Sequence, residues 1–343
     1  MRRHARTLIA VTAAALLASC GTAAPGGPGG PTITVDNCGA PAEFPAPAQR
    51  MFVNDGNMIS MVLALGAQQQ VAAVSSLQRD ADVLRRHYGD AVDRLPVVAP
   101  SSPSRETVLA QRPDVVVAGW NYGYSESTRL TPDGLRGAGI AGYVLTESCR
   151  QGAGKARGIV EPWQALRTDL TNLGAITGRT EQAARVNADV QRRLDALRAA
   201  PQPRRKPTIF LFDSASDTVF SSGNKGGPQA IIDAAGGRNA IEDVRDTWTK
   251  VSWERVAASE PDAFLFVDYP PQTFAEKVAM LRARPGIDRL RAVTEQRFLN
   301  LPYSMWTSGP LNIDAAEQVR AQLERWGLVP PSGLVPRSDD RVG

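Results

Sequence analysis

One pattern of residues occurs twice in this chain, over residues 104–114 and 252–262, and reads Ser-x-Glu-x-Val-x-Ala-x-x-Pro-Asp in both places. A serine in front of a helix is typical of an N-cap, and the helix dipole favours a glutamate in the first turn. Pro-Asp indicates the end of the helix, and the apolar runs 115–118 and 263–267 that follow indicate buried parallel strands. The repeat therefore predicts two similarly built α/β lobes, with Glu106 and Glu254 at the same corner of each lobe.

The first residues have the features of a secretion signal. Three arginines precede the apolar run 8–17, which is too short to span a bilayer as a mature helix. Leu17-Ala18-Ser19-Cys20 matches the bacterial lipobox, in which the cysteine is acylated and becomes the first residue after cleavage. We expect Cys20 to carry palmitate-type chains that hold the protein on the outer, extracytoplasmic side of the cell membrane. The alternative is an ordinary signal peptide with a chance cysteine.

The composition divides the rest of the chain into segments. A run of about 22 residues, 179–200, has apolar residues at three- and four-residue spacing and predicts a helix of about 33 Å, long enough to bridge two lobes. The predicted organisation is a signal peptide at 1–19, the lipidated cysteine and a flexible tether at 20–47, an N-terminal lobe at 48–160, a helical connector at 161–204, a C-terminal lobe at 205–329 and a loose tail at 330–343.

Two cysteines remain once Cys20 is assigned to lipid. In an oxidising envelope we expect Cys38 and Cys149 to form a disulfide, although two free buried thiols are the alternative. The closed loop would be long, so the cross-link would stabilise the fold by about 4–5 kcal/mol in the chain-entropy account.

Charge and motifs argue against nucleic-acid binding and against catalysis. The formal net charge of +4 falls close to zero once the arginines of residues 1–19 are removed, and no basic block is present. His87 is the only histidine after residue 19, which leaves little for a catalytic triad or a multi-histidine metal site, and we expect it on the surface or in a loop. Residues 223–227 form a Gly-rich turn that lacks the spacing of a P-loop, but its N–H groups and Lys225 could bind an anionic ligand.

Aromatic residues follow the predicted strands of both lobes. In α/β sheets, ligands bind beyond the carboxyl ends of the strands, and loops at those ends would face each other across a cleft. An aromatic cleft with scattered arginines and lysines suits a large, flat or anionic ligand, although some of these rings could simply pack the loops. The candidate ligand contacts are Trp120, Tyr122, Tyr124, Tyr269, Tyr303 and Trp306.

With these features the chain resembles the solute-binding lipoproteins of ABC importers for ferric siderophores, haem and cobalamin, the class III binding proteins with a helical backbone. The resemblance covers roughly residues 48–328 and rests on the two Ser-x-Glu segments together with residues 63–66, 173–174 and 234–239. Residues 284–293 and 308–310 and the placement of Cys38 and Cys149 are similar to the ferric-dicitrate and siderophore branch. Ser60 departs from the family, in which many members carry glutamate.

The resemblance implies an α/β fold of two Rossmann-like lobes joined by a single long backbone helix, with the ligand cleft between the lobes. It implies that Glu106 and Glu254 dock into arginine pockets on the two subunits of an ABC permease, and that the lobes rock slightly rather than swing widely. It also implies no enzymatic activity.

The expected function is therefore capture of an iron chelate and its delivery to the permease, by a protein that acts as a monomer without a cofactor or bound metal of its own. A ferric siderophore is favoured over haem, for which Tyr122, Tyr269 or Tyr303 could supply an axial ligand. The alternatives are a cobalamin receptor and a non-transporting scaffold of the cell envelope with the same fold.

Overall fold

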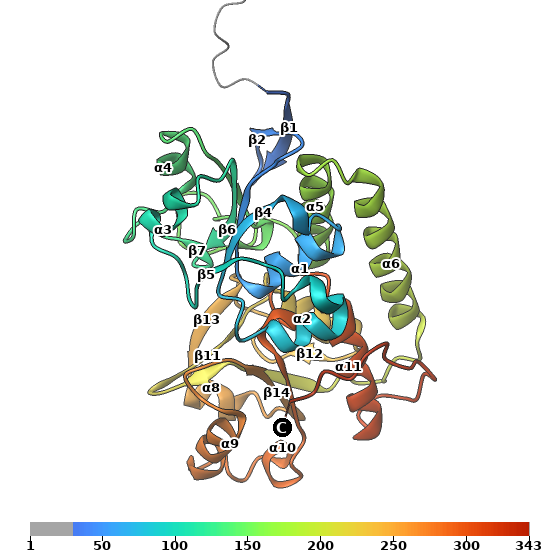
Figure 1. The fold of residues 1–343 in the computed structure, drawn as a ribbon. Helices are drawn as coiled ribbons and strands as arrows, with labels where there is room; N and C mark the ends of the chain where they lie inside the picture. The colour runs from blue at the N-terminus through green and yellow to red at the C-terminus, as the bar shows by residue number, and fades with distance from the viewer. Residues whose placement is uncertain (1–29, 343) are drawn as a thin grey trace, which may run out of the picture. The chain divides into compact units, whose positions relative to one another are not determined.

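The computed structural model describes residues 30–342 (Figure 1). The predicted signal peptide and the lipid site at Cys20 lie outside the described residues. From Pro31 onward the chain forms one unit that contains both predicted lobes.

The N-terminal lobe is built on a parallel sheet. Its strand order is β5-β4-β3-β6-β7. Strand β8 lies off this path and also pairs with β6. The central strand β6 is buried along nearly its whole length, as its apolar sequence predicts for a strand covered on both faces. The strands are β3 (Met51–Asn54), β4 (Val71–Ser75), β5 (Val97–Ala99), β6 (Val115–Trp120), β7 (Gly123–Tyr124) and β8 (Ala141–Val144). The helices between them are α1 (Gly56–Ala64), α2 (Ala81–Tyr88), α3 (Arg105–Ala110) and α4 (Pro132–Arg136).

The C-terminal lobe repeats this plan on a smaller scale. A parallel sheet of order β12-β9-β14-β15 is joined by a three-stranded antiparallel sheet, β10-β11-β13, which the sequence did not predict. The parallel strands are β9 (Thr208–Phe212), β12 (Arg238–Asn239), β14 (Ala263–Asp268) and β15 (Phe298–Pro302), and the antiparallel strands are β10 (Ser214–Ala215), β11 (Thr218–Ser222) and β13 (Trp248–Ser252). The helices are α7 (Gly227–Ala234), α8 (Trp253–Ala258), α9 (Phe274–Ala283), α10 (Arg291–Thr294) and α11 (Asn312–Arg325).

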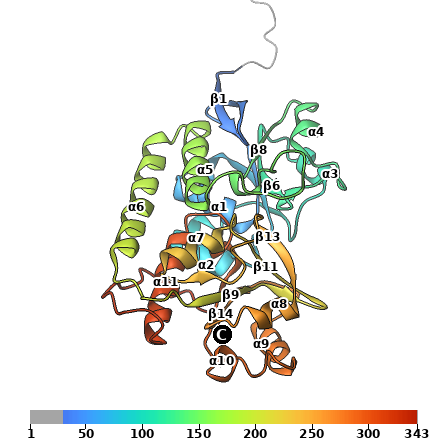
Figure 2. The same cartoon turned by 180° about the vertical axis from the view of Figure 1, so that it is seen from behind.

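Two helices connect the lobes. Helix α5 (Pro162–Ile176) is followed by Gly178, whose φ of +68° favours glycine, and α6 (Thr180–Ala199) then runs back beside it. Helix α6 is about 30 Å long and extends from the N-terminal lobe to α11 of the C-terminal lobe (Figures 1 and 2). There Arg193 pairs with Asp314 and Glu317, each at 2.7 Å. The predicted architecture of two α/β lobes and one long helix is confirmed.

The segment after the predicted lipid site is not a flexible tether throughout. Residues 32–45 form an antiparallel hairpin of β1 (Thr32–Asn37) and β2 (Ala40–Pro45), and this part of the expectation is wrong. Cys38 and Gly39 both have positive φ, as the two central residues of a tight hairpin turn require. Phe44 is buried and its ring lies 5.7 Å from that of Tyr143, so the hairpin adds to the N-terminal lobe.

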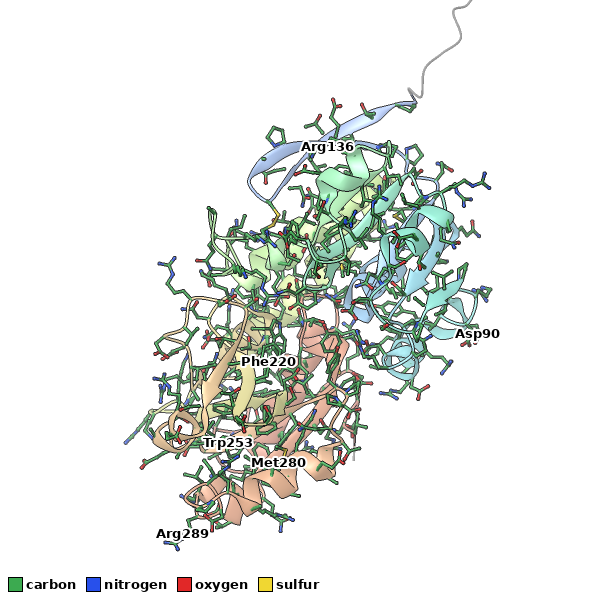
Figure 3. The ribbon with its side chains drawn as sticks, turned by 90° about the vertical axis from the view of Figure 1, so that its left-hand side faces the viewer. Asp90, Arg136, Phe220, Trp253, Met280 and Arg289 are labelled. Carbon is green, nitrogen blue, oxygen red and sulfur yellow. A yellow bond between two sulfur atoms is a disulfide. The ribbon has the colours of Figure 1, made fainter. Side chains whose placement is uncertain are left out.

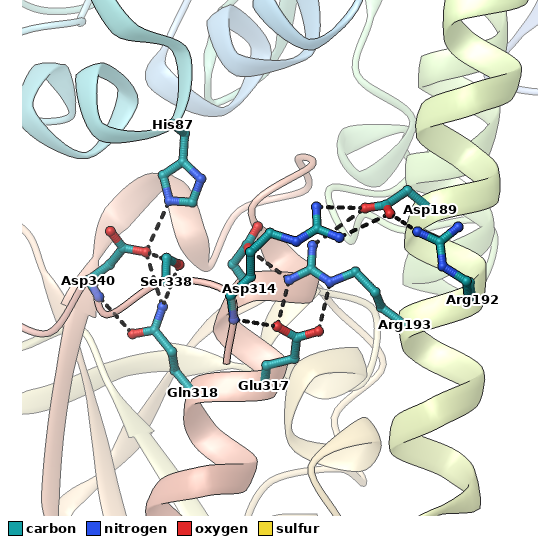
Figure 4. Close-up of polar contacts among 10 residues, drawn as sticks. His87, Asp189, Arg192, Arg193, Asp314, Glu317, Gln318, Ser338 and Asp340 are labelled. Atoms are coloured by element: carbon teal, nitrogen blue, oxygen red, sulfur yellow. Dashed lines mark hydrogen bonds and ion pairs between the residues drawn. The ribbon is translucent and has the colours of Figure 1, made fainter. Parts of the chain in front are cut away.

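The C-terminal tail is also ordered, contrary to expectation. The Asp340 side chain is 1 % exposed and accepts a hydrogen bond from Gln318 on α11 at 3.0 Å (Figure 4). The Nε2 atom of His87, on α2 of the other lobe, lies 3.0 Å from the same carboxylate. Burial raises the pKa of Asp340, but hydrogen bonds from His87, Ser338 and Arg86 outweigh it and hold the pKa below its ordinary value. His87 is therefore a helical residue that binds the tail, and the tail ties the two lobes together.

The predicted disulfide is confirmed. Cys38 at the turn of the β1–β2 hairpin is bonded to Cys149, with a Cα–Cα distance of 5.3 Å and a sequence separation of 111 residues. The bond fixes the hairpin to the segment that follows β8.

Replacing both cysteines, as Cys38→Ser and Cys149→Ser, should lower the free energy of unfolding by about 2–5 kcal/mol because the unfolded chain regains the freedom of a long loop. Urea unfolding followed by circular dichroism would measure the change. Reductant should destabilise the unaltered protein to a similar extent and leave the double variant unaffected. Equal stability of the two proteins without reductant would contradict the expectation.

Candidate functional site

The carboxyl ends of the parallel strands in the two lobes meet. The hydroxyl of Tyr303, just after β15, donates a hydrogen bond of 3.1 Å to Asp55, just after β3. The amide of Asn57, at the start of α1, donates one of 2.8 Å to the carbonyl oxygen of Ser308. Ligands in sheets of this kind bind beyond these strand ends, so the contact between the lobes is the candidate site.

A guanidinium packs against two tyrosine rings, which also contact each other, at this contact. Arg79, in the loop after β4, sits 4.8 Å from the ring centre of Tyr269 and 4.7 Å from that of Tyr303. It also forms an ion pair with Asp55. Two aromatic faces and a carboxylate together provide the environment that a desolvated cation prefers.

A second carboxylate stands beside this group. Asp80 Oδ1 accepts the backbone N–H of Ser304 at 2.9 Å, and Oδ2 lies 3.6 Å from Arg79 Nε. A Cβ on Gly56 would lie 2.3 Å from Asp80 Oδ2, so only glycine leaves room for the carboxylate. Burial, together with the nearby Asp55 charge, raises the pKa of Asp80 to about 7. Burial also raises the pKa of Asp55, despite its contact with Arg79.

A third buried carboxylate crosses the contact farther along. Glu147, after β8 in the N-terminal lobe, accepts backbone N–H groups of Ser308 at 2.6 Å and Gly227 at 3.2 Å, both in the C-terminal lobe. Burial raises the pKa of Glu147 to about 7, although these two amides and the Arg157 charge act in the opposite direction. Gly227 belongs to the Gly-rich turn that was expected to bind an anionic ligand. Its N–H group binds the carboxylate of Glu147 instead.

Three further N–H groups of that turn are also in use. Those of Gly223, Asn224 and Lys225 donate to carbonyl oxygens in residues 244–247, and the Lys225 ammonium pairs with Glu161 at 2.7 Å. The turn therefore closes on its own lobe and on the connector helix. Lys225 as a ligand contact stays a prediction.

Four of the predicted aromatic contacts lie at the candidate site. Tyr269 and Tyr303 hold Arg79, while Tyr122 is 5.7 Å from the Arg157 guanidinium and Trp120 is 3.7 Å from that of Arg150. The structure places the other two inside the lobes. Tyr124 donates to the carbonyl oxygen of Val116, and the Trp306 Nε1 donates to carbonyl oxygens in β14 and β15; both are fully buried.

The sequence analysis missed the charged members of the site. Asp55 follows a buried strand directly and precedes glycine, which is a local signal for a turn at a strand end. Arg79 and Asp80 lie between β4 and α2, and Glu147 lies in a short 3₁₀ helix after β8. Each becomes part of a site only through residues of the other lobe.

Several buried polar atoms at this contact have no hydrogen-bond partner within the described residues. A buried polar group without a partner costs free energy, and such atoms mark places where water or a ligand binds. They are Asn57 Oδ1, Arg79 Nε, Asp80 Oδ2, Tyr122 Oη, Trp248 Nε1, Ser304 Oγ and Ser308 Oγ.

The repeated helices present their glutamates in matching ways. Ser104 caps α3 with φ −74° and ψ 161°, and Ser252 caps α8 with φ −76° and ψ 160°. Glu106 and Glu254 follow in the first turns and are exposed. The pKa of Glu106 is lowered by backbone and Ser104 hydrogen bonds and that of Glu254 by its bond with Ser252, so both are ionised at neutral pH.

The two helices lie on one side of the molecule, away from α6, in both views of Figures 1 and 2. Figure 3 faces that side, with Arg136 of α4 marking the N-terminal lobe and Trp253 of α8 the C-terminal lobe.

Comparison with known proteins agrees with this architecture. Residues 55–304 match the family model described as periplasmic binding protein. The chain belongs to the periplasmic binding protein family. Proteins of this family bind solutes outside the cytoplasm for ABC permeases and are not enzymes.

Individual relatives are distant. The vitamin B12-binding protein of Salmonella typhimurium is 25 % identical over 47 % of this chain and 53 % of its own length, so the chain spans about half of that relative. An ABC-type Fe³⁺-hydroxamate transport protein from Saccharomonospora viridis has the same fold, with a TM-score of 0.69 and 21 % identity over 85 % of this chain and 98 % of that one. A periplasmic haem-binding protein from Pseudomonas aeruginosa gives 0.64 and 23 %, over 86 % and 100 %.

Two further observations concern residues 30–342. In this part of the chain no helix is both long and apolar enough to cross a membrane. Nor do three or more histidine, cysteine, aspartate or glutamate side chains of the described residues gather in a way that could hold a metal ion.

The raised pKa of Glu147 leads to a prediction about pH. Because folding raises this pKa from 4.5 to about 7, the contribution of Glu147 to stability is full below pH 4.5 and is lost as the pH rises through 7. Glu147→Gln should remove this loss, so the free energy of unfolding of the variant relative to the unaltered protein should improve by up to about 3 kcal/mol between pH 4.5 and pH 8.

Urea unfolding at a series of pH values would test this. The matched control is Glu43→Gln, an exposed glutamate in β2. Its stability should follow that of the unaltered protein at every pH. Parallel pH profiles for Glu147→Gln and the unaltered protein would show that the buried carboxyl does not titrate as described.

Proposed function

We propose that this chain is a lipid-anchored substrate-binding protein of an ABC importer, which captures a ferric siderophore or haem between its lobes and delivers it to the permease. Cys20 would carry the lipid. The observation that carries the proposal is the gathering of buried tyrosines, carboxylates and unpartnered polar atoms where the strand ends of the two lobes meet. Such a surface is costly to bury and gains most from a bound ligand.

The chemistry of the contact favours a large ligand with both flat and polar parts. Tyr122, Tyr269, Tyr303 and Trp120 offer aromatic surface from both lobes, and Trp120 and Tyr269 are only half-buried. The proteins of similar sequence or fold named above bind an Fe³⁺-hydroxamate, haem or vitamin B12, which are ligands of this size and character. An iron chelate is therefore the ligand class that we favour.

The paired glutamates support delivery to a permease. Glu106 and Glu254 have the same local geometry, remain ionised and lie on one side of the molecule. Two matched anionic side chains suit recognition by arginines on two related subunits.

Binding can be tested by titration of residues 31–343, the unit that carries both lobes. A ferric hydroxamate, a ferric catecholate, a ferric mycobactin-type siderophore, haemin and cobalamin would be added in turn, with iron-free chelators as controls. One ferric chelate should quench the tryptophan fluorescence saturably at micromolar concentration or below, because Trp120 lies at the site. Trp120→Phe should bind equally well with a smaller signal. Absence of binding by every compound would refute the proposed ligand class.

Delivery can be separated from binding with the double variant Glu106→Ala/Glu254→Ala. We expect its affinity for the ligand to stay within about twofold of the unaltered protein, because neither side chain contacts the site, while uptake through the reconstituted permease falls by at least about tenfold. The matched control is Asp90→Ala/Glu181→Ala, which removes the same charge from exposed positions in the turn after α2 and on α6. Uptake at the normal rate by Glu106→Ala/Glu254→Ala would refute the docking role, as would an equal loss of affinity and uptake.

A further inference from the structure

The buried charged side chains at the contact between the lobes indicate which charge on a ligand this site prefers. We propose that the contact between the lobes recognises a positively charged group on its ligand, in a cage formed by Asp55, Asp80, Tyr269 and Tyr303 that Arg79 fills in the ligand-free protein. This inference rests on the proposed function and names the chemical class of ligand within it.

The first step is the geometry around Arg79. Its guanidinium has an aromatic ring at 4.8 Å and another at 4.7 Å, and the two ring centres are 4.7 Å apart. Asp55 pairs with it, and Asp80 Oδ2 is 3.6 Å away. The two rings and the two carboxylates are all complementary to a cation, and the protein's own Arg79 occupies this position.

The second step concerns the charge that remains when Arg79 leaves. Asp55 and Asp80 have side chains 5 % and 0 % exposed, so each would be a buried carboxylate without a counter-ion. Asp80 Oδ2 already lacks a hydrogen-bond partner among the described residues, as does Ser304 Oγ beside it. An unpaired buried charge is strongly unfavourable, so an ammonium or guanidinium group would restore the balance, whereas an anionic ligand could take this place only with both carboxyl groups protonated.

The surrounding charges act in the same direction. Asp213 and Glu147 are further buried acids whose charges reach the site. Two further cations lie beside these acids: Lys277 donates to the carbonyl oxygens of Val267 and Tyr269, and Arg157 donates to that of Trp120. With Arg79, Lys277 and Arg157 counted, the four acids Asp55, Asp80, Glu147 and Asp213 still outnumber the cations by one.

The third step is access. The Arg79 side chain is 19 % exposed and lies in a turn between β4 and α2 rather than inside a helix or strand. Tyr269, which contacts Arg79, is also half-buried. Rotation of one side chain in this turn would therefore free the cage toward solvent while the lobes keep their other contacts.

The test compares two ligands that differ in one charge. Ferric desferrioxamine B carries a free ammonium group, and its N-acetylated form has the same iron coordination without that charge. In titrations of the full mature protein we expect the ammonium form to bind about tenfold more tightly. The anionic complexes ferric citrate and ferric enterobactin should bind more weakly than either.

Variants locate the preference. Tyr269→Leu removes one of the two aromatic rings that contact the cation, at a half-buried position, and Asp55→Asn removes a charge; both should reduce the affinity ratio of the ammonium form to the acetylated form from tenfold to about one, whatever their effect on the affinity that the two forms share. Arg79→Met removes the internal competitor and should tighten binding of the ammonium form alone. Tyr88→Leu, a half-buried tyrosine on α2 that does not contact Arg79, is the control and should leave the preference intact.

The outcomes are distinguishable. Equal affinity for the two desferrioxamine forms, or tighter binding of the anionic chelates, would overturn the charge preference and leave the proposed import function standing. Loss of all chelate binding in Arg79→Met would also overturn it, because Arg79 would then contact the ligand itself. If haemin alone binds, the import function stands and the cage does not serve it. If no compound binds to the unaltered protein, both proposals fail.

Discussion

The arrangement of the two lobes depends on carboxylates that are buried where they meet. Asp55, Asp80 and Glu147 all belong to the N-terminal lobe, and each accepts a hydrogen bond from the C-terminal lobe. Bringing them together removes three acidic groups from water, and the raised pKa values show that this dehydration outweighs the bonds gained. The lobes therefore meet through hydrogen bonds that are specific in geometry, and the dehydration of the carboxyl groups opposes them.

The features that could be predicted from the sequence are those set by neighbouring residues. The strand β6 and the helix α3 before it follow from one local pattern, and β14 and α8 follow from its repeat, because a cap, a first-turn glutamate and a Pro-Asp stop act within a few residues. The exposed glutamates fall in this class. The long α6 was predictable for the same reason, since its apolar spacing is periodic along the chain.

The features that could not be predicted depend on partners far away in the sequence. The tail is held by partners far away in the sequence, among them His87 and Gln318 at Asp340 and Asp189 at Arg337, and nothing near residue 340 indicates those partners. Arg79 is likewise an ordinary polar residue of a loop until Tyr303 supplies a ring for it. The hairpin at 32–45 is a different case, because its turn at Cys38-Gly39 and its alternating burial depend on neighbouring residues. It was missed because the Gly- and Pro-rich stretch before it led the whole segment to be predicted as a flexible tether.

The position of α6 has a mechanical consequence for the opposite side of the molecule. Helix α6 and the docked tail connect the lobes, while α3 and α8 lie on the side away from α6 (Figures 1 and 2). If one lobe rotates about an axis on the connected side, points far from that axis move farther than points near it. The spacing between α3 and α8 is therefore an amplified measure of the rotation at the ligand site, available on the outer surface to a protein that never touches the ligand.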